Sequence, residues 1–131
     1  MRTLIVEDNK DTGQLLQMIV EVYGEVEIAF DGLEALQALR QTWDTGQHYD
    51  LILLDVRMPR MDGLETLRCL REEEDHRSII EAQRAKVIML TAYADEQNMQ
   101  LAFQLGCQGY IFKTQGKAKI LQRLRALGLI E

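Results

Sequence analysis

Proline is almost absent from this sequence, and cysteine and aromatic residues are scarce. One proline and two cysteines occur in 131 residues, and aromatic residues make up 6% of the chain. With so little proline, we expect regular elements joined by short turns rather than proline-rich linkers. Cys69 and Cys107 stand far apart without a C-x-x-C motif, so we expect buried or half-buried free thiols and a reducing, cytosolic environment.

The sequence also lacks an excess of basic residues and any long apolar run. Fifteen basic residues stand against 21 acidic ones, which gives a formal net charge of −6. That sign disfavours a nucleic-acid backbone as the main partner and favours basic protein patches or metal cations. No apolar run approaches the roughly 20 residues of a membrane helix. We therefore expect a cytoplasmic protein that neither binds nucleic acid directly nor inserts into a membrane.

The length and the apolar content bound the number of domains. The chain has 131 residues, and 47% of them are hydrophobic. A chain of this size buries about two-thirds of its extended surface on folding, which is enough for a stable core. We therefore expect residues 1–131 to form a single domain.

Short apolar runs alternate with stretches of helical periodicity along the whole chain. The apolar runs predict strands at residues 3–6, 25–29, 51–54, 86–90 and 109–112. Apolar residues spaced three and four apart predict a helix after each strand, and Asp11 or Thr12 is expected to cap the first helix. The run at 51–54 is apolar throughout, which is typical of a parallel strand buried on both faces. Five such units indicate a doubly wound α/β fold.

Two stretches fit this alternation poorly. Residues 41–49 form a polar connection that is longer than usual. Residues 71–84 form a charged extension ahead of the fourth strand, which we interpret as a solvated helix face. An insertion that contacts a specific partner is the alternative interpretation of the second stretch.

Four of the five predicted strands end in a reactive polar side chain. Glu7 and Asp8 follow the first strand, Asp55 the third, Thr91 the fourth and Lys113 the fifth. Ligands of open α/β sheets bind at the carboxyl ends of the strands, so we expect these groups to converge. Two like charges about 4 Å apart repel by roughly 4 kcal/mol at an effective dielectric near 20, so three carboxylates need a counter-charge. A hard cation such as Mg²⁺ would supply it.

Asp55 ends the central strand and is the candidate acceptor of a phosphoryl group. A carboxylate can form an aspartyl-phosphate, and phosphoryl transfer needs mainly positioning and neutralisation of three equatorial oxygens. The cation could take one of these oxygens, the Thr91 hydroxyl a second and the Lys113 ammonium a third. Each residue type at the predicted edge therefore has a task in phosphoryl transfer.

Five segments across residues 4–127 combine in an order and spacing that is typical of one family. They are LIVEDN at 4–9, DGLEAL at 31–36, DLILLDVRMPRMDG at 50–63, VIMLTA at 87–92 and GCQGYIFK at 106–113. The chain thus resembles the response regulator receiver domain, the phosphoacceptor module of two-component signalling. The resemblance implies a flavodoxin-like, three-layer sandwich with a parallel sheet in the order 2-1-3-4-5.

The resemblance also assigns the site residues. Asp55 would be phosphorylated by a histidine kinase or a histidine phosphotransfer protein, and Lys113 would pair with the phosphoryl oxygens. Mg²⁺ would be held by Glu7, Asp8, Asp55 and the backbone carbonyl of Arg57. No enzymatic activity is expected beyond phosphorylation and dephosphorylation of Asp55 itself.

Two residues would act as the switch that follows phosphorylation. By resemblance, Thr91 would move toward the phosphoryl group, and the Tyr110 ring would swing inward as it does. An ordinary core aromatic is the alternative interpretation of Tyr110. The cognate kinase, the downstream partner and the oligomeric state are left open.

Two positions depart from the family pattern. The family usually has proline, in a cis bond, directly after the lysine, whereas Thr114 follows Lys113 here. A cis bond to a non-proline residue costs about 2.5–4 kcal/mol, so the bond is either trans or offset by packing. Arg57 stands where a smaller or neutral residue would leave the site more open. We hypothesise that Arg57 and Tyr93 screen the acyl phosphate from water and set its lifetime.

Two other functions are compatible with the same fold. A nucleotide or flavin site would need a glycine-rich or hydroxyl-rich turn after the first strand, but residues 7–11 are mainly acidic. A binding module that does not depend on phosphorylation is the second alternative, and the change at Thr114 is its best support. The sequence leaves open whether the chain is a single-domain receiver or a piece of a longer protein.

Overall fold

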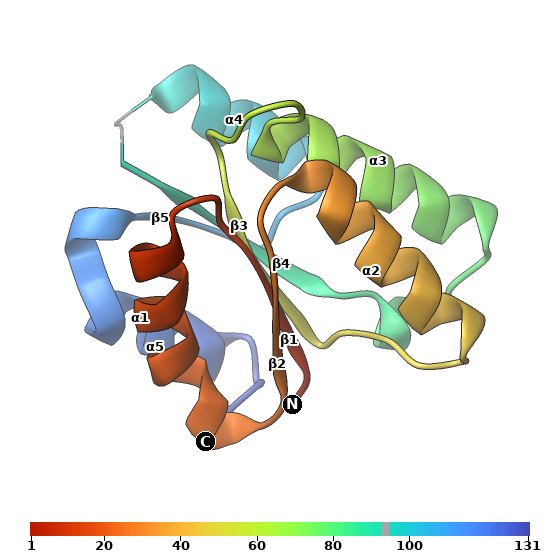
Figure 1. The fold of residues 1–131 in the computed structure, drawn as a ribbon, viewed down its shortest axis with the longest axis horizontal. Coiled ribbons are helices and arrows are strands. Elements are labelled where there is room, and N and C mark those ends of the chain that lie inside the picture. Colours follow the sequence, from red (N-terminus) through yellow and green to blue (C-terminus); the bar gives the residue numbers. More distant parts are fainter. Residues whose placement is uncertain (93–94) are drawn as a thin grey trace.

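This computed structural model describes residues 1–92 and 95–131, in which five strands form one parallel sheet with helices on both faces (Figure 1). The strands are β1 (Thr3–Val6), β2 (Val26–Ala29), β3 (Leu51–Asp55), β4 (Lys86–Thr91) and β5 (Gly109–Phe112). They lie in the order β2-β1-β3-β4-β5, which confirms the doubly wound fold and the strand order. Each strand lies within one residue of its predicted bounds.

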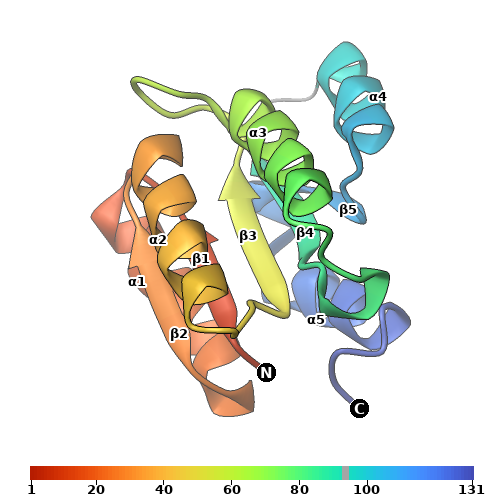
Figure 2. The ribbon, with the colours of Figure 1, turned by 90° about the vertical axis from the view of Figure 1, so that its right-hand side faces the viewer.

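Within the described residues, five α-helices pack on the sheet in two layers. They are α1 (Lys10–Val20), α2 (Gly32–Asp44), α3 (Gly63–His76), α4 (Glu96–Leu105) and α5 (Gly116–Ala126). Short 3₁₀ turns are η1 (Glu21–Tyr23), η2 (Glu81–Gln83) and η3 (Lys113–Gln115). Figures 1 and 2 show α1 and α5 on one face of the sheet and α2, α3 and α4 on the other. The three-layer sandwich is therefore confirmed.

Two apolar clusters fill the space between the sheet and the helices, one on each face. Strand β3 contributes to both, because its successive side chains point to opposite faces of the sheet. Ile52 and Leu54 belong to the cluster with α2, α3 and α4, whereas Leu51 and Leu53 belong to the cluster with α1 and α5. All four are at most 1% exposed. The uninterrupted apolar run therefore reflects burial on both faces, and it places Asp55 at the end of a rigid strand.

The cap of α1 differs from the prediction. Asn9 caps the helix, rather than Asp11 or Thr12, because its Oδ1 accepts a hydrogen bond from the Thr12 amide at 2.9 Å. The helix therefore begins at Lys10, only two residues after Asp8. The acidic pair after β1 is thus held between a buried strand and a capped helix.

The two polar stretches are more regular than the sequence indicated. Residues 41–44 belong to α2, which continues to Asp44, so only 45–49 of this stretch form a connection. The interpretation of 71–84 as a solvated face is wrong for Arg71 and Glu74. Glu74 is 1% exposed and accepts a hydrogen bond from Arg71 Nη1 at 2.7 Å. The Arg71 guanidinium also binds the Gly106 carbonyl, so this pair ties α3 to the end of α4.

Two further expectations concern the cysteines and membrane helices. Cys69 is half-buried, Cys107 is buried, and both are free thiols, as predicted. Across residues 1–92 and 95–131, the helices are too short or too polar to cross a membrane.

Candidate functional site

The carboxyl ends of β1, β3, β4 and β5 meet at one edge of the sheet, where the predicted site residues lie together. The register of β1 against β3 places Glu7, the residue after β1, beside Asp55. The registers of β4 and β5 place Thr91 and Lys113 on the other side of Asp55. The convergence that the strand ends predicted is therefore present.

Three carboxyl groups gather at this edge. Oxygens of Glu7, Asp8 and Asp55 lie within 4.8 Å of one another and form a candidate metal site. Glu7 is 1% exposed and Asp55 6%, whereas Asp8 is open to solvent. Because little water reaches the buried pair, a cation close by is needed to stabilise negative charge there.

Lys113 supplies one such cation. Its Nζ donates a hydrogen bond to Glu7 Oε1 at 2.6 Å and lies 3.3 Å from Asp55 Oδ2. Burial and the neighbouring Asp55 raise the pKa of Glu7, and Lys113 offsets that rise only in part. Burial tends to lower the pKa of Lys113, but Glu7 and Asp55 outweigh it, so the pKa of Lys113 is raised. The ammonium therefore stays charged between the two carboxylates.

The donor set fits a hard divalent cation. The second oxygen of Glu7, Oε2, is buried and accepts no hydrogen bond from the described residues. Lys113 contributes one positive charge beside the three carboxyl groups of this cluster. Oxygen ligands with excess negative charge suit Mg²⁺ and similar ions.

Arg57 lies two residues after Asp55, in the loop 56–62 that leads to α3. Its amide donates a hydrogen bond to Asp55 Oδ1 at 3.3 Å, which keeps its backbone next to the carboxylate. The Arg57 side chain is exposed at the edge of the site. The loop therefore holds the backbone nitrogen of Arg57, the residue whose carbonyl the resemblance implies as a ligand, next to Asp55.

The comparisons with known proteins agree with this geometry. The model of the response regulator receiver domain matches residues 3–125. The chain belongs to this receiver domain family. A family that acts as a phosphoacceptor in signalling thus accounts for the acidic edge of the sheet.

Relatives of this receiver domain occur inside longer proteins. The transcriptional regulatory protein CpxR of Escherichia coli is 33% identical over 127 residues, which cover 96% of this chain and 48% of CpxR. The osmosensing histidine protein kinase SLN1 of Saccharomyces cerevisiae is 28% identical over 122 residues, which cover 92% of this chain and 9% of SLN1. The chain therefore spans half or less of these two relatives.

Solved structures of receiver domains share the fold over nearly the whole chain. The chemotaxis protein CheY4 of Vibrio cholerae is 25% identical with a TM-score of 0.79, and the match covers 95% of this chain and 96% of CheY4. A chain of the CheX–CheY–BeF₃–Mg²⁺ complex of Borrelia burgdorferi is 28% identical with a TM-score of 0.82, covering 99% of this chain and 90% of that one. A Mn²⁺-bound form of the response regulator Rcp1 is 27% identical with a TM-score of 0.76, and the match covers 98% of this chain and 94% of the Rcp1 chain. Two of these three solved structures thus contain a divalent ion.

The two predicted switch residues of this receiver domain lie on neighbouring strands. Thr91, at the end of β4, is buried, and Tyr110 on β5 is half-buried with its hydroxyl enclosed. Burial raises the pKa of Tyr110, and the nearby Thr91 side chain opposes that rise. The Tyr110 ring also meets Phe112 edge-on, with centroids 6.3 Å apart. The two side chains are therefore close enough for a movement of one to affect the other.

The missing proline does not displace Lys113. In residues 1–92 and 95–131 every peptide bond is trans, including the one between Lys113 and Thr114. Lys113 opens the 3₁₀ turn η3, and the Gln115 side chain accepts a hydrogen bond from the Phe112 amide at 3.0 Å. With this turn and a trans bond, the ammonium of Lys113 contacts both Glu7 and Asp55.

Arg57 and Tyr93 are the two residues predicted to screen an acyl phosphate from water. Tyr93 lies outside the described residues, whereas Arg57 is exposed beside the site and lowers the pKa of Tyr110 slightly against the larger effect of burial. Screening of an acyl phosphate by Arg57 and Tyr93 stays a prediction.

Proposed function

We propose that this receiver domain accepts a phosphoryl group on Asp55 and that the modification switches a protein-interaction surface in a phosphorelay pathway. The observation that supports this most directly is the buried Asp55 carboxylate, which lies between Lys113 and a second buried acid, Glu7. An oxygen of Asp55 would bond to phosphorus as the bond between phosphorus and the donor breaks. The donor would be a phosphohistidine of a kinase or phosphotransfer protein.

Each site residue has a chemical task in this proposal. The ammonium of Lys113 neutralises one phosphoryl oxygen, and the Thr91 hydroxyl donates a hydrogen bond to another. The movement of Thr91 would draw Tyr110 inward and alter the surface around α4 and β5. A bound Mg²⁺ would neutralise further charge, and its ligands would be Glu7, Asp8, Asp55 and the Arg57 carbonyl.

Incubation with acetyl phosphate tests the proposal without a partner protein. In the presence of Mg²⁺ the protein should gain one phosphoryl group, because Asp55 and Lys113 provide the nucleophile and one counter-charge while the ion provides the rest. Removal of divalent ions with a chelator should abolish the reaction. Intact-protein mass spectrometry measures both results, and equal phosphorylation with and without the chelator would contradict the proposed role of the metal.

Residues 1–131 would form one receiver domain, which would work in the cytoplasm. It would undergo phosphorylation and dephosphorylation of Asp55 but no other reaction. It would contact proteins rather than nucleic acid, in keeping with the net charge of −6.

An apolar groove beside the site suits the approach of a phosphohistidine donor. The groove runs between α1 and α5 and has a volume of about 450 Å³. Its lining includes Leu15, Ile19, Phe112 and Lys113. Because Lys113 belongs both to this groove and to the contacts of Asp55, a protein that covers the groove would bring its histidine next to Asp55.

Substituting Leu15 with glutamine should slow phosphotransfer from a protein donor about tenfold, which corresponds to about 1.4 kcal/mol of lost docking energy. Leu15 is 63% exposed, so its apolar surface is available to a partner and the substitution costs the fold little. The rate with acetyl phosphate should not change, since that donor needs no docking surface. Both rates can be followed with a histidine phosphotransfer domain that phosphorylates the wild type and with acetyl phosphate.

Val22 provides the matched control for this prediction. It is 75% exposed in η1 and does not line the groove. Val22→Gln should therefore leave both rates at the wild-type level. Equal slowing with both donors in Leu15→Gln would indicate a damaged site instead of a lost docking contact.

A further inference from the structure

The loop between β3 and α3, residues 56–62, is fastened at both of its ends. The Val56 amide donates a hydrogen bond to a carbonyl of β4 at 3.0 Å, and the Gly63 amide donates one to the Val56 carbonyl at 2.8 Å. A Cβ on Gly63 would collide with the backbone carbonyl of Asp55, so the two ends of the loop touch. Between these ends the loop carries Arg57, whose carbonyl is a proposed metal ligand. The position of Arg57 therefore depends on the contacts that hold the middle of the loop.

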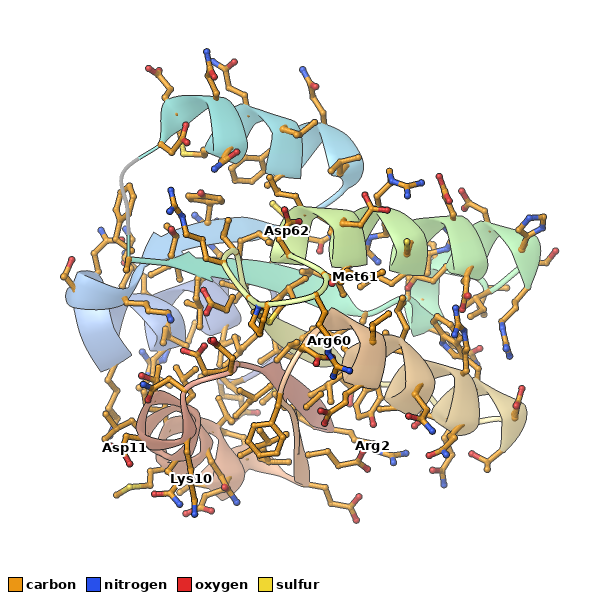
Figure 3. The ribbon with its side chains drawn as sticks, turned by 45° about the horizontal axis from the view of Figure 1, so that its top comes forward. Arg2, Lys10, Asp11, Arg60, Met61 and Asp62 are labelled. Carbon is orange, nitrogen blue, oxygen red and sulfur yellow. The ribbon has the colours of Figure 1, made fainter. Side chains whose placement is uncertain are left out.

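Arg60 fastens the middle of the loop to α2. Its backbone is left-handed, with φ at 65°. Figure 2 shows the loop near the first turn of α2, and Figure 3 shows Arg60 beside that turn. Arg60 Nε donates a hydrogen bond to Asp31 Oδ2 at 2.8 Å, and Nη2 donates to the same oxygen. Nη2 also lies 3.9 Å from Glu34 Oε2. One side chain therefore bridges the loop after β3 and the residues that begin α2.

Asp31, which accepts these hydrogen bonds from Arg60, is itself held in place by burial and by a hydrogen bond to α2. Its side chain is 5% exposed, and its other oxygen, Oδ1, caps α2 by accepting a hydrogen bond from the Glu34 amide at 2.9 Å. Burial tends to raise the pKa of Asp31, but the Glu34 amide and Arg60 outweigh burial, so the pKa is lowered. Because this charge is buried and held by several donors, Arg60 contacts a fixed point rather than a mobile surface group.

Close packing also joins the loop 56–62 to the start of α2, next to the ion pair of Arg60 and Asp31. A Cβ on Gly32, the first residue of α2, would collide with the Thr66 hydroxyl and lie 2.9 Å from Met61 Cγ. The Thr66 hydroxyl donates a hydrogen bond to the Asp62 carbonyl at 2.8 Å. The loop and the first turns of α2 and α3 therefore form one block, with Arg60 as its charged link.

We propose that Arg60 is a positioning residue for the metal site. It holds the loop 56–62 against the start of α2 and so keeps the backbone of Arg57, whose carbonyl would bind the ion, next to Asp55. The inference rests on the proposed function, since it concerns a ligand of the proposed Mg²⁺. A group that orients a ligand changes metal affinity without touching the metal, and its loss commonly costs about tenfold or more in affinity.

Arg60→Ala should therefore weaken Mg²⁺ binding about tenfold, measured as Kd by isothermal titration calorimetry. Arg60→Lys keeps the charge and one possible hydrogen bond to Asp31, so it should recover part of the affinity. Arg68→Ala is the matched control because it removes the same side chain, whose guanidinium pairs with Glu65 and Glu72 along the exposed face of α3. The control should bind Mg²⁺ like the wild type.

Two further measurements separate positioning from a general loss of stability. In metal-free protein, Arg60→Ala should speed hydrogen exchange of the amides at Arg57 and Met58 and leave the amides of β4 protected. At saturating Mg²⁺ the rate of phosphorylation by acetyl phosphate should return to the wild-type value, because only the affinity for the ion has changed. A merely structural role would speed exchange throughout the sheet.

The outcomes for Arg60 and for the proposed function are distinguishable. A wild-type protein that bound no Mg²⁺ would contradict the proposed function. If the wild type binds Mg²⁺ but Arg60→Ala and Arg68→Ala have equal affinities, the role of Arg60 is overturned and the proposed function stands.

Discussion

Asp55→Asn is expected to abolish phosphorylation by acetyl phosphate and by a phosphohistidine protein. The amide has nearly the size and shape of the carboxylate, but its oxygen is a poor nucleophile and carries no charge to bind the metal. No acyl phosphate can therefore form at this position. Intact-protein mass spectrometry should show one added phosphoryl group on the wild type and none on the variant.

The loss should not come from unfolding. Glu7 and Asp55 are the buried acids of the candidate site. Burial is the main cause of the raised pKa of Glu7, and the neighbouring Asp55 raises it further. Removal of one negative charge relieves this repulsion. Lys113 keeps its hydrogen bond to Glu7, so the metal-free variant should unfold at or above the Tm of the wild type. A thermal melt of both proteins checks this point.

Asp50 offers the matched control because it stands at the opposite end of β3. Its Oδ2 accepts a hydrogen bond from the Arg2 amide at 2.7 Å, and an asparagine oxygen can accept the same bond. Asp50→Asn should be phosphorylated like the wild type. Full phosphorylation of Asp55→Asn would contradict the assignment of Asp55 as the phosphoryl acceptor.

The strands and the site edge could be predicted because they depend on local patterns. The run from Leu51 to Leu54 is apolar on both faces, and only a strand in the middle of a covered sheet needs that pattern. In a parallel sheet the residue after each strand lies at the same edge, so Glu7, Asp55 and Lys113 could be grouped without coordinates. The strand order itself came from the resemblance rather than from these patterns.

The ion pairs between distant segments could not be predicted in this way. Arg60 and Asp31 are 29 positions apart, and no spacing rule connects a loop residue with the cap of another helix. Glu74 looked like one of several acids on a solvated helix face, but α3 turns it toward β4, where it accepts a hydrogen bond from the Ala85 amide at 3.3 Å. Pairs of this kind depend on how helices pack on the sheet, which the one-dimensional pattern does not contain.

Lys113→Met should slow phosphorylation by acetyl phosphate about a hundredfold, the usual cost of losing one preorganised group that stabilises developing charge. The Lys113 ammonium contacts both Glu7 and Asp55. Methionine keeps much of the apolar stem but cannot neutralise a phosphoryl oxygen. Rates of phosphoryl incorporation at saturating Mg²⁺ measure the effect.

Metal affinity distinguishes this chemical role from damage to the site. Lys113 is a positive charge in direct contact with two proposed Mg²⁺ ligands, so its removal leaves the cluster more negative. Lys113→Met should therefore bind Mg²⁺ at least as tightly as the wild type while reacting far more slowly. Lys117→Met, an exposed lysine of α5, should change neither quantity. Weaker Mg²⁺ binding in Lys113→Met would mean that the lysine holds the metal ligands in place. That result would contradict a role of Lys113 in neutralising a phosphoryl oxygen.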